Sequence, residues 1–289
     1  MAASHSFDEH VSRWKRARSR LRAAQWIRNG RVPGASGYSS ARWSAIERAL
    51  ADPTDTAYGH DDAGLDERVV EYPWALHRLA SHRTPGSPIL DAGSVLNHAR
   101  LLAYCRRQGL SPLSIVTLKY EGHAHVSDDV RYEFADLRNL PYRSGWFESV
   151  VCLSTLEHVG MDNTMYGDAS AASAQPSREV GAALRELRRV TRPGGVLLLS
   201  VPFGARADFG GWRIFDEDDV VQLESSAGWK ADATRVFRAT KDGWRESSIA
   251  DAGDAGYNQP RDRAGTARRT APDWVSAAEA VALVELTAV

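Results

Sequence analysis

The stretch PILDAGSVLN, residues 88–97, decides the fold of this 289-residue chain. Its apolar residues end a short strand, and Gly93 follows at once. A glycine directly after a buried strand permits a tight turn and lets a ligand approach the backbone closely. Residues 96–108 then predict a helix that ends at Gly109, and residues 113–119 predict a second strand. This order of strand, helix and strand indicates an α/β fold built on a parallel sheet.

The same pattern continues along the chain. Five further strands are expected, at residues 130–135, 147–153, 196–201, 229–239 and 278–287. The run 147–153 is almost wholly apolar, as in a parallel strand that is covered on both faces. Residues 179–190 predict an amphipathic helix, and residues 216–227 a second one. The sequence therefore predicts seven mostly parallel strands flanked by helices, with the last two strands antiparallel.

The region before residue 84 shows helical patterns without strands, and it predicts an N-terminal helical extension. Helices are expected over residues 7–27, 41–50 and 65–81, and Pro73 should kink or restart the third. The first helix carries six basic residues between positions 13 and 22. That run indicates either an RNA or phosphate patch or the solvated face of an accessory helix. We expect two domains, residues 1–83 and residues 84–289.

Composition and charge narrow the class of protein. Lys and Arg total 36 and Asp and Glu total 37, and this net charge of −1 argues against a dedicated nucleic-acid binder. No apolar run approaches the roughly 18 residues that a membrane span needs, and no signal core opens the chain. Cys105 and Cys152 are too few and too far apart for a disulfide framework or a zinc site. The sequence predicts a cytoplasmic protein without nucleic-acid, membrane or metal partners.

Four segments together resemble one enzyme family. They are ILDAG (89–93), Asp136-Leu137 after a strand, SVVCLSTLEHV (149–159) and LRELRRVTRPGG (184–195). In order and spacing they look like class I S-adenosylmethionine-dependent methyltransferases, over roughly residues 88–201. The resemblance implies a Rossmann-like fold, methyl transfer as the reaction and S-adenosylmethionine as the cofactor. In open parallel sheets, ligands bind outside the carboxyl ends of the strands at the switch point.

The resemblance also implies which side chains hold the cofactor. The expected cofactor-binding residues are Asp91, Gly93, Ser94, Asn97, Lys119, Glu121, Asp136, Leu137 and Ser154. Asp91 is expected to hold the turn or to meet the ammonium of the methionine part. Asp136 is expected to accept a hydrogen bond from the adenine amino group, or else to cap its own loop. Leu137 would pack on the adenine ring.

Two features depart from the family pattern. Only Gly93 remains of three alternating glycines, and the loop continues through Val95 to Asn97. Asn97 tolerates a left-handed conformation whereas Val95 does not, so the loop must differ in shape. The acid that normally grips the ribose after the second strand is also missing, so Glu121 or backbone groups would substitute. The absence of the later glycines likewise disfavours a dinucleotide dehydrogenase, which needs G-x-G-x-x-G.

Glu157 and His158 are the expected catalytic pair, because they follow the fourth strand where the acceptor meets the methyl group. Methyl transfer is an in-line displacement that needs an oriented lone pair, and an amine acceptor must first lose a proton. A carboxylate attracts a cationic amine, and a histidine can take a proton near neutral pH. The alternative is a structural role in which the pair caps the following helix. The sequence leaves both interpretations open.

The loop that follows predicts where the acceptor binds. Asp162, Tyr166 and Asp168 would bind hydroxyls or amines, and Phe203 and Trp212 would line the opposite wall. The chain resembles methyltransferases of sugar, polysaccharide and aminoglycoside antibiotic biosynthesis. We therefore expect methylation of an amino or hydroxyl group on a small sugar-containing metabolite such as an aminoglycoside, with the amine favoured.

Other functions and assemblies stay open at this point. One alternative is a module that binds S-adenosylmethionine without catalysis, because the glycine loop is thinned. Another is an RNA methyltransferase that uses the arginine-rich first helix. A homodimer is also possible. The sequence names neither the acceptor nor the position that is methylated.

Overall fold

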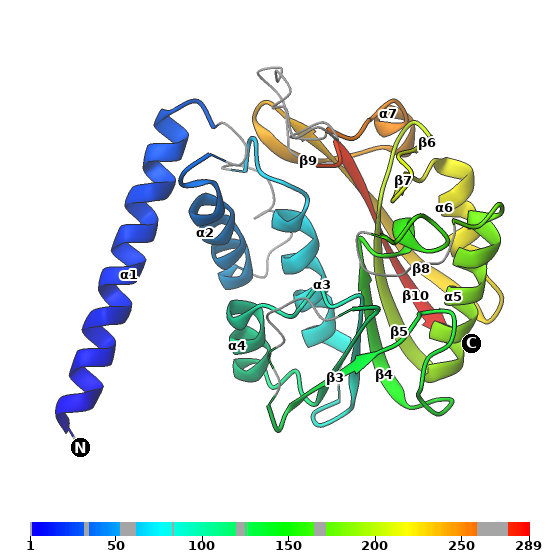
Figure 1. Ribbon diagram of the computed structural model, residues 1–289, viewed down its shortest axis with the longest axis horizontal. Helices are drawn as coiled ribbons and strands as arrows, with labels where there is room; N and C mark the ends of the chain where they lie inside the picture. Colours follow the sequence, from blue (N-terminus) through cyan, green and yellow to red (C-terminus); the bar gives the residue numbers. More distant parts are fainter. Residues whose placement is uncertain are drawn as a thin grey trace. The chain divides into compact units, whose positions relative to one another are not determined.

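The computed structural model describes residues 2–31, 35–52, 62–82, 84–119, 125, 127–164, 172–258 and 277–289 (Figure 1). The chain divides into two compact units. The first comprises Met1–Pro73, Arg238–Arg245 and Tyr257–Glu279, and the second comprises Trp74–Phe237, Glu246–Gly256 and Ala280–Val289. The division expected from the sequence, at residue 83, stays a prediction about domains.

The described residues form one eight-stranded sheet in the order β3-β2-β1-β4-β5-β10-β8-β9. The strands are β1 (Ile89–Ala92), β2 (Leu113–Thr117), β3 (Val130–Phe134), β4 (Phe147–Leu153), β5 (Thr191–Pro202), β8 (Trp229–Thr240), β9 (Gly243–Ser247) and β10 (Ala280–Ala288). From β3 to β5 all neighbouring strands are parallel, and β10 runs antiparallel to β5. The expected α/β fold with a mostly parallel sheet is confirmed.

The order of the strands places a switch point between β1 and β4. From β1 the chain steps outward through β2 to β3, and then returns to β4 and continues to β5. Loops that leave β1 and β4 therefore diverge to opposite sides and leave room for a ligand at the carboxyl end of the sheet. All seven residues of β4 are buried, as expected for a strand covered on both faces.

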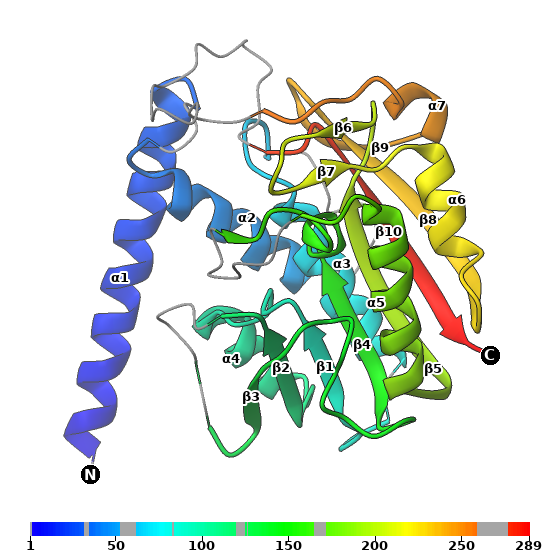
Figure 2. The ribbon, with the colours of Figure 1, turned by 45° about the vertical axis from the view of Figure 1, so that its right-hand side comes forward.

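Helices cover both faces of this sheet (Figure 1). Helices α5 (Pro176–Val190) and α6 (Glu217–Glu224) lie side by side on one face, and α4 (Ala99–Arg107) lies on the other (Figures 1 and 2). The buried positions of α5 recur at helical spacing, which is the amphipathic face that the sequence predicted: Val180, Ala183, Leu184, Leu187 and Val190. The second unit also holds the short helix α7 (Ile249–Ala252) and the small hairpin of β6 (Ala207–Asp208) and β7 (Arg213–Ile214).

One expectation about elements was wrong, and one about Pro73 is met only in part by the structure. The sheet has eight strands among the described residues rather than seven, because β9 was missed. This strand has five residues and only one large apolar side chain, Trp244, so its periodicity is too short to detect. Helix α3 (Arg68–His82) continues through Pro73, so the helix does not restart there, and the expected kink stays a prediction. Its neighbours Val70 and Ala75 are fully buried, and packing holds the helix where one hydrogen bond is lost.

The first unit contains α1 (Ala2–Arg28), α2 (Tyr38–Ala51) and the beginning of α3. Helix α1 packs on α2 through Trp26, whose ring meets Tyr38 edge-on at 5.7 Å between centroids. Trp244 is fully buried in this unit and donates from Nε1 to the Leu65 carbonyl at 3.0 Å. Among the described residues, no helix is long and apolar enough to cross a membrane.

Candidate active site

The loop after β1 is held by a buried carboxylate. Asp91 is fully buried and accepts the backbone N–H of Val95 at 3.1 Å and of Leu96 at 2.8 Å. Hydrogen bonds to a charged group each contribute about 1.5–3 kcal/mol. These contacts hold the turn after β1, which is one of the two roles expected for Asp91. They fix a narrow loop at the switch point without the usual alternating glycines. The other role, a contact with the ammonium of the cofactor, stays a prediction.

Gly93 is at the one loop position that must lack a side chain. Its φ of +125° lies in the region that favours glycine. A Cβ there would lie 2.1 Å from Oγ1 of Thr155, which follows β4. The loops after β1 and β4 therefore approach each other closely at this glycine.

Ser94 and Asn97 tie this loop to the neighbouring strands. Ser94 takes a left-handed conformation (φ +62°), and its hydroxyl lies 3.1 Å from the hydroxyl of Tyr132 on β3. Asn97 is fully buried, and its Oδ1 accepts the backbone N–H of His125 at 3.2 Å. The described part of the chain supplies no hydrogen-bond partner for its Nδ2. The left-handed residue is thus Ser94, which is how this loop differs in shape from the glycine-rich pattern.

The ends of β2 and β3 carry the residues expected around the ribose and the adenine. Lys119 is exposed just after β2, and Glu121 lies outside the described residues. Leu137 is 7% exposed. The apolar side chains of Leu118 and Phe134, at the ends of paired strands, are 40% and 57% exposed. The sequence analysis did not select either of these exposed apolar residues.

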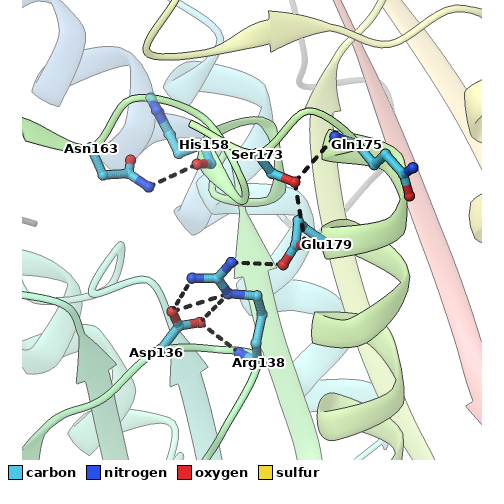
Figure 3. A network of polar contacts seen from close by, with 7 residues as sticks. All are labelled: Asp136, Arg138, His158, Asn163, Ser173, Gln175 and Glu179. Atoms are coloured by element: carbon cyan, nitrogen blue, oxygen red, sulfur yellow. Dashed lines mark hydrogen bonds and ion pairs between the residues drawn. The ribbon is translucent and has the colours of Figure 1, made fainter. Parts of the chain in front are cut away.

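Asp136 is part of an ionic network (Figure 3). Its carboxylate accepts the backbone N–H of Arg138 at 2.8 Å and the guanidinium of the same residue at 2.6 Å. Arg138 also donates to Glu179 on α5 at 2.7 Å. The hydrogen bond to Asp136, followed by the one to Glu179, raises the pKa of Arg138. The carboxylate that was expected to meet the adenine amino group is therefore held in place by an arginine.

Glu157 and His158 lie on the short helix η2 (Leu156–His158), directly after β4. The turn into this helix is strained at Ser154, which has a φ of +38° and whose N–H donates to the Ser200 carbonyl at 3.0 Å. Nδ1 of His158 lies 2.6 Å from the Gly211 carbonyl oxygen. A carbonyl only accepts, so Nδ1 carries the proton and Nε2 is the nitrogen that can take one up.

Two buried carboxylates lie near the turn between β4 and η2. Glu157 is 3% exposed, and Asp91 is fully buried on the adjacent strand. Burial, and then the charges of Glu157 and Asp91, raise the pKa of the Cys152 thiol well above its ordinary value. The two carboxylates therefore act on the same point, and the switch point carries a negative field suited to a cationic ligand.

The segment expected to bind the acceptor is described only in part. Asp162 accepts the N–H of Thr164 at 3.0 Å, and its own N–H donates to Gly210. Tyr166 and Asp168 lie outside the described residues. Trp212 stacks on Phe209 at 5.6 Å and lies 6.5 Å from the His158 ring, so the structure brings Trp212 and His158 together.

Phe203, which was expected to line the acceptor wall, is buried, and Asn163, which was not selected, contacts His158. Phe203 is 1% exposed and packs in the core beneath the site. Asn163, which was not selected, is 6% exposed and donates to the His158 carbonyl at 3.0 Å (Figure 3). Its Oδ1 is buried without a hydrogen-bond partner. Its place in a polar loop was the only sequence signal for it.

Comparison with known proteins agrees with this geometry. Residues 93–199 match a methyltransferase domain family. A 27-O-demethylrifamycin SV methyltransferase of Amycolatopsis mediterranei is 29% identical over 160 residues, which cover 54% of this chain and 45% of that protein. The match therefore spans less than half the length of this relative.

Solved structures share the fold at low identity. A 1,6-didemethyltoxoflavin-N1-methyltransferase of Burkholderia thailandensis, solved with 1,6-didemethyltoxoflavin and S-adenosylhomocysteine, is 17% identical with a TM-score of 0.46. That alignment covers 86% of this chain and 89% of the other. A methyltransferase of Methanosarcina mazei that depends on S-adenosylmethionine is 13% identical with a TM-score of 0.42, covering 73% and 97%. These likenesses are too distant to support an argument about function.

Residues 93–199, which match the methyltransferase domain family, run from the loop after β1 into β5 and so include the carboxyl end of β4 at the switch point. S-adenosylmethionine is the cofactor of this domain. The acceptor and the site residues are matters of proposal.

Proposed function

We propose that the protein transfers a methyl group from S-adenosylmethionine to an amino or hydroxyl group of a small sugar-containing metabolite, such as an aminoglycoside. The observation that carries this proposal is the arrangement of Glu157 and His158 after β4, with the Nδ1 proton of His158 committed to the Gly211 carbonyl. That bond assigns the proton to Nδ1, and Nε2 would then act as the general base.

The residues around the switch point fit the cofactor. A close approach of backbone needs the bare Cα of Gly93, and a cationic sulfonium or ammonium is favoured near Asp91 and Glu157. We assign the methionine end to the loop of Gly93 and Ser94 and to Ser154. Asn97 would support that loop through its bond to His125. When bound, the cofactor supplies an electrophilic methyl group on a sulfonium.

The adenosine end would rest on the ends of β2 and β3. Asp136 would accept from the adenine amino group while Arg138 holds the carboxylate in place. Leu137 would pack on the ring. The ribose would be met near Lys119 and Glu121. Hydrogen bonding to the 6-amino group then requires an adenine rather than a hypoxanthine ring.

In the proposed mechanism, Glu157 attracts the protonated amine and His158 Nε2 removes its proton, which frees the lone pair for in-line attack. Trp212, stacked on Phe209 beside His158, excludes water from the reacting atoms. Asp162, Tyr166 and Asp168 would bind the hydroxyls or amines of the acceptor, and Phe203 supports that wall from the core. The relative named for 27-O-demethylrifamycin SV supports a small-molecule acceptor.

Methyl transfer to a panel of aminosugars and aminocyclitols, followed by mass spectrometry, tests the proposal. We expect Glu157→Gln and His158→Ala to lower turnover by about 10- to 100-fold, in the range of acid–base contributions. Their dissociation constants for S-adenosylhomocysteine should stay within about twofold of the wild-type value. Wild-type turnover in both variants would remove the catalytic roles and leave the pair a structural one.

A further inference from the structure

The first unit contains three carboxylates that lie close together, and we call Asp66, Glu67 and Glu71 the carboxylate cluster. They are 8%, 6% and 0% exposed. Two of the three have a guanidinium partner. Arg42 donates to Asp66 at 2.7 Å, and Arg68 donates to Glu71 at 2.6 Å. The described residues supply no such ion pair for the Glu67 side chain, so the cluster carries one carboxylate in excess.

Glu67 also differs from Glu71 in its hydrogen bonding. Among the described residues, nothing forms a hydrogen bond with the buried Oε2 of Glu67 or with the buried Oδ1 of Asp66. A buried carboxylate oxygen without a donor is costly, so a group of this kind points to a missing partner. Burial, and then the charge of Glu71, raises the pKa of Glu67 to about 8. Asp66 acts in the same direction, whereas Arg68 opposes it.

Aromatic rings surround these carboxylates in the same unit. Tyr38 donates from its hydroxyl to Asp66 at 3.0 Å. Trp43 and Tyr72 stack at 6.4 Å with an interplanar angle of 22°. Arg42 lies over the Trp43 ring at 6.0 Å, and Arg68 over the Tyr72 ring at 5.7 Å. These ring faces already attract cations, as expected for aromatic quadrupoles.

We propose that the carboxylate cluster is a binding site for an organic ammonium group, with Glu67 as the carboxylate that pairs with it. One monocation balances the one excess carboxylate, and it supplies donors to Oε2 of Glu67 and Oδ1 of Asp66. An ammonium is favoured over a metal ion, because the described part of the chain contains no group of three side chains placed to hold a metal.

Binding at this site must be coupled to a proton. At pH 7 the Glu67 carboxyl is mostly protonated, because its pKa is about 8. A bound ammonium favours the carboxylate, so about one proton leaves Glu67 for each amine bound. The charged groups that face Glu67 are Asp66, Arg68 and Glu71, with Arg42 behind Asp66. An ammonium held at an exposed surface carboxylate would release no proton at this pH.

Calorimetric titration of the full chain with cyclohexylamine tests the proposal, with cyclohexanol as the neutral control of the same shape. Measurements at pH 7 in two amine-free buffers of different ionisation enthalpy count the protons released. We expect saturable binding of the amine alone, with release of about one proton. Glu67→Gln should weaken amine binding by at least about tenfold and abolish the proton release. The control Glu47→Gln, an equal charge change at an exposed position of α2, should change neither.

Three results would overturn the inference: no amine binding, equal binding of amine and alcohol, or proton release that persists in Glu67→Gln. The first would make Glu67 a protonated buried acid only. The wild-type measurement of proton release needs no variant, so it stands even if a variant folds poorly. Titration of the same samples with S-adenosylhomocysteine keeps the two proposals apart. Cofactor binding without amine binding removes this site alone, and amine binding without cofactor binding removes the proposed function.

Discussion

Asp91 and Glu67 are both buried carboxylates, but they are satisfied to very different degrees. Asp91 receives two backbone N–H groups within 3.1 Å, whereas Oε2 of Glu67 receives none. The difference indicates that a fully bonded carboxylate builds the scaffold, and an unsatisfied one is kept for a ligand.

Removing Asp91 should have the largest effect. Asp91→Ala leaves the buried N–H groups of Val95 and Leu96 without acceptors, at about 1–3 kcal/mol each. We expect the free energy of unfolding to fall by about 2–6 kcal/mol in chemical denaturation, together with loss of S-adenosylhomocysteine binding. A loss below about 1 kcal/mol would mean that the loop does not depend on this carboxylate, and the contrast with Glu67 would disappear.

A methyl group at Gly93 tests the close approach of the two loops. Gly93→Ala places a Cβ against Thr155, and overpacking of this kind costs about 1–3 kcal/mol. We expect affinity for S-adenosylhomocysteine to fall by about 10- to 100-fold in calorimetric titration. Gly86→Ala is the matched control, because Gly86 also has a positive φ (+81°) but its Cβ would meet nothing within 4 Å. Equal losses in both variants would assign the effect to backbone strain alone.

The effect of Glu67→Gln on stability should depend on pH. The folded-state pKa of about 8 lies above the ordinary value, so the folded protein holds a proton that the unfolded chain has lost. The stability of the wild-type protein should therefore fall as pH rises toward about 8 and then level off. Glutamine removes this titration. The melting temperature of the variant relative to wild type should rise between about pH 5 and pH 8, and a constant difference would argue against a raised pKa.

The smallest effect is expected at the ionic network of Asp136. Arg138 is about one-third exposed, so solvent weakens its pairs with Asp136 and Glu179. We expect Arg138→Met to lower the free energy of unfolding by about 1 kcal/mol or less and to weaken S-adenosylhomocysteine binding a few-fold. Arg178→Met, at an exposed position of the same helix as Glu179, is the control. An equal loss in the control would show that the network does not position Asp136.

Sequence alone predicts the parts of this protein that rest on local pattern. The strand before Asp91, the glycine after it and the Glu157-His158 pair were all placed at the carboxyl edge of the sheet, because strand ends follow from apolar runs. The contact between His158 and the Gly211 carbonyl could not be predicted, because Gly211 lies in the loop between β6 and β7, far from His158 in the sequence. The sequence also does not show that Oε2 of Glu67 is buried without a donor among the described residues, because burial and pairing are properties of the folded chain.

Titration with S-adenosylhomocysteine tests cofactor binding, which the proposed methyl transfer requires. A nicotinamide dinucleotide serves as the control ligand. We expect micromolar binding of S-adenosylhomocysteine and no binding of the dinucleotide. A folded protein that binds neither ligand would contradict the proposed function, because the loop held by Asp91 would then have kept the fold and lost the cofactor.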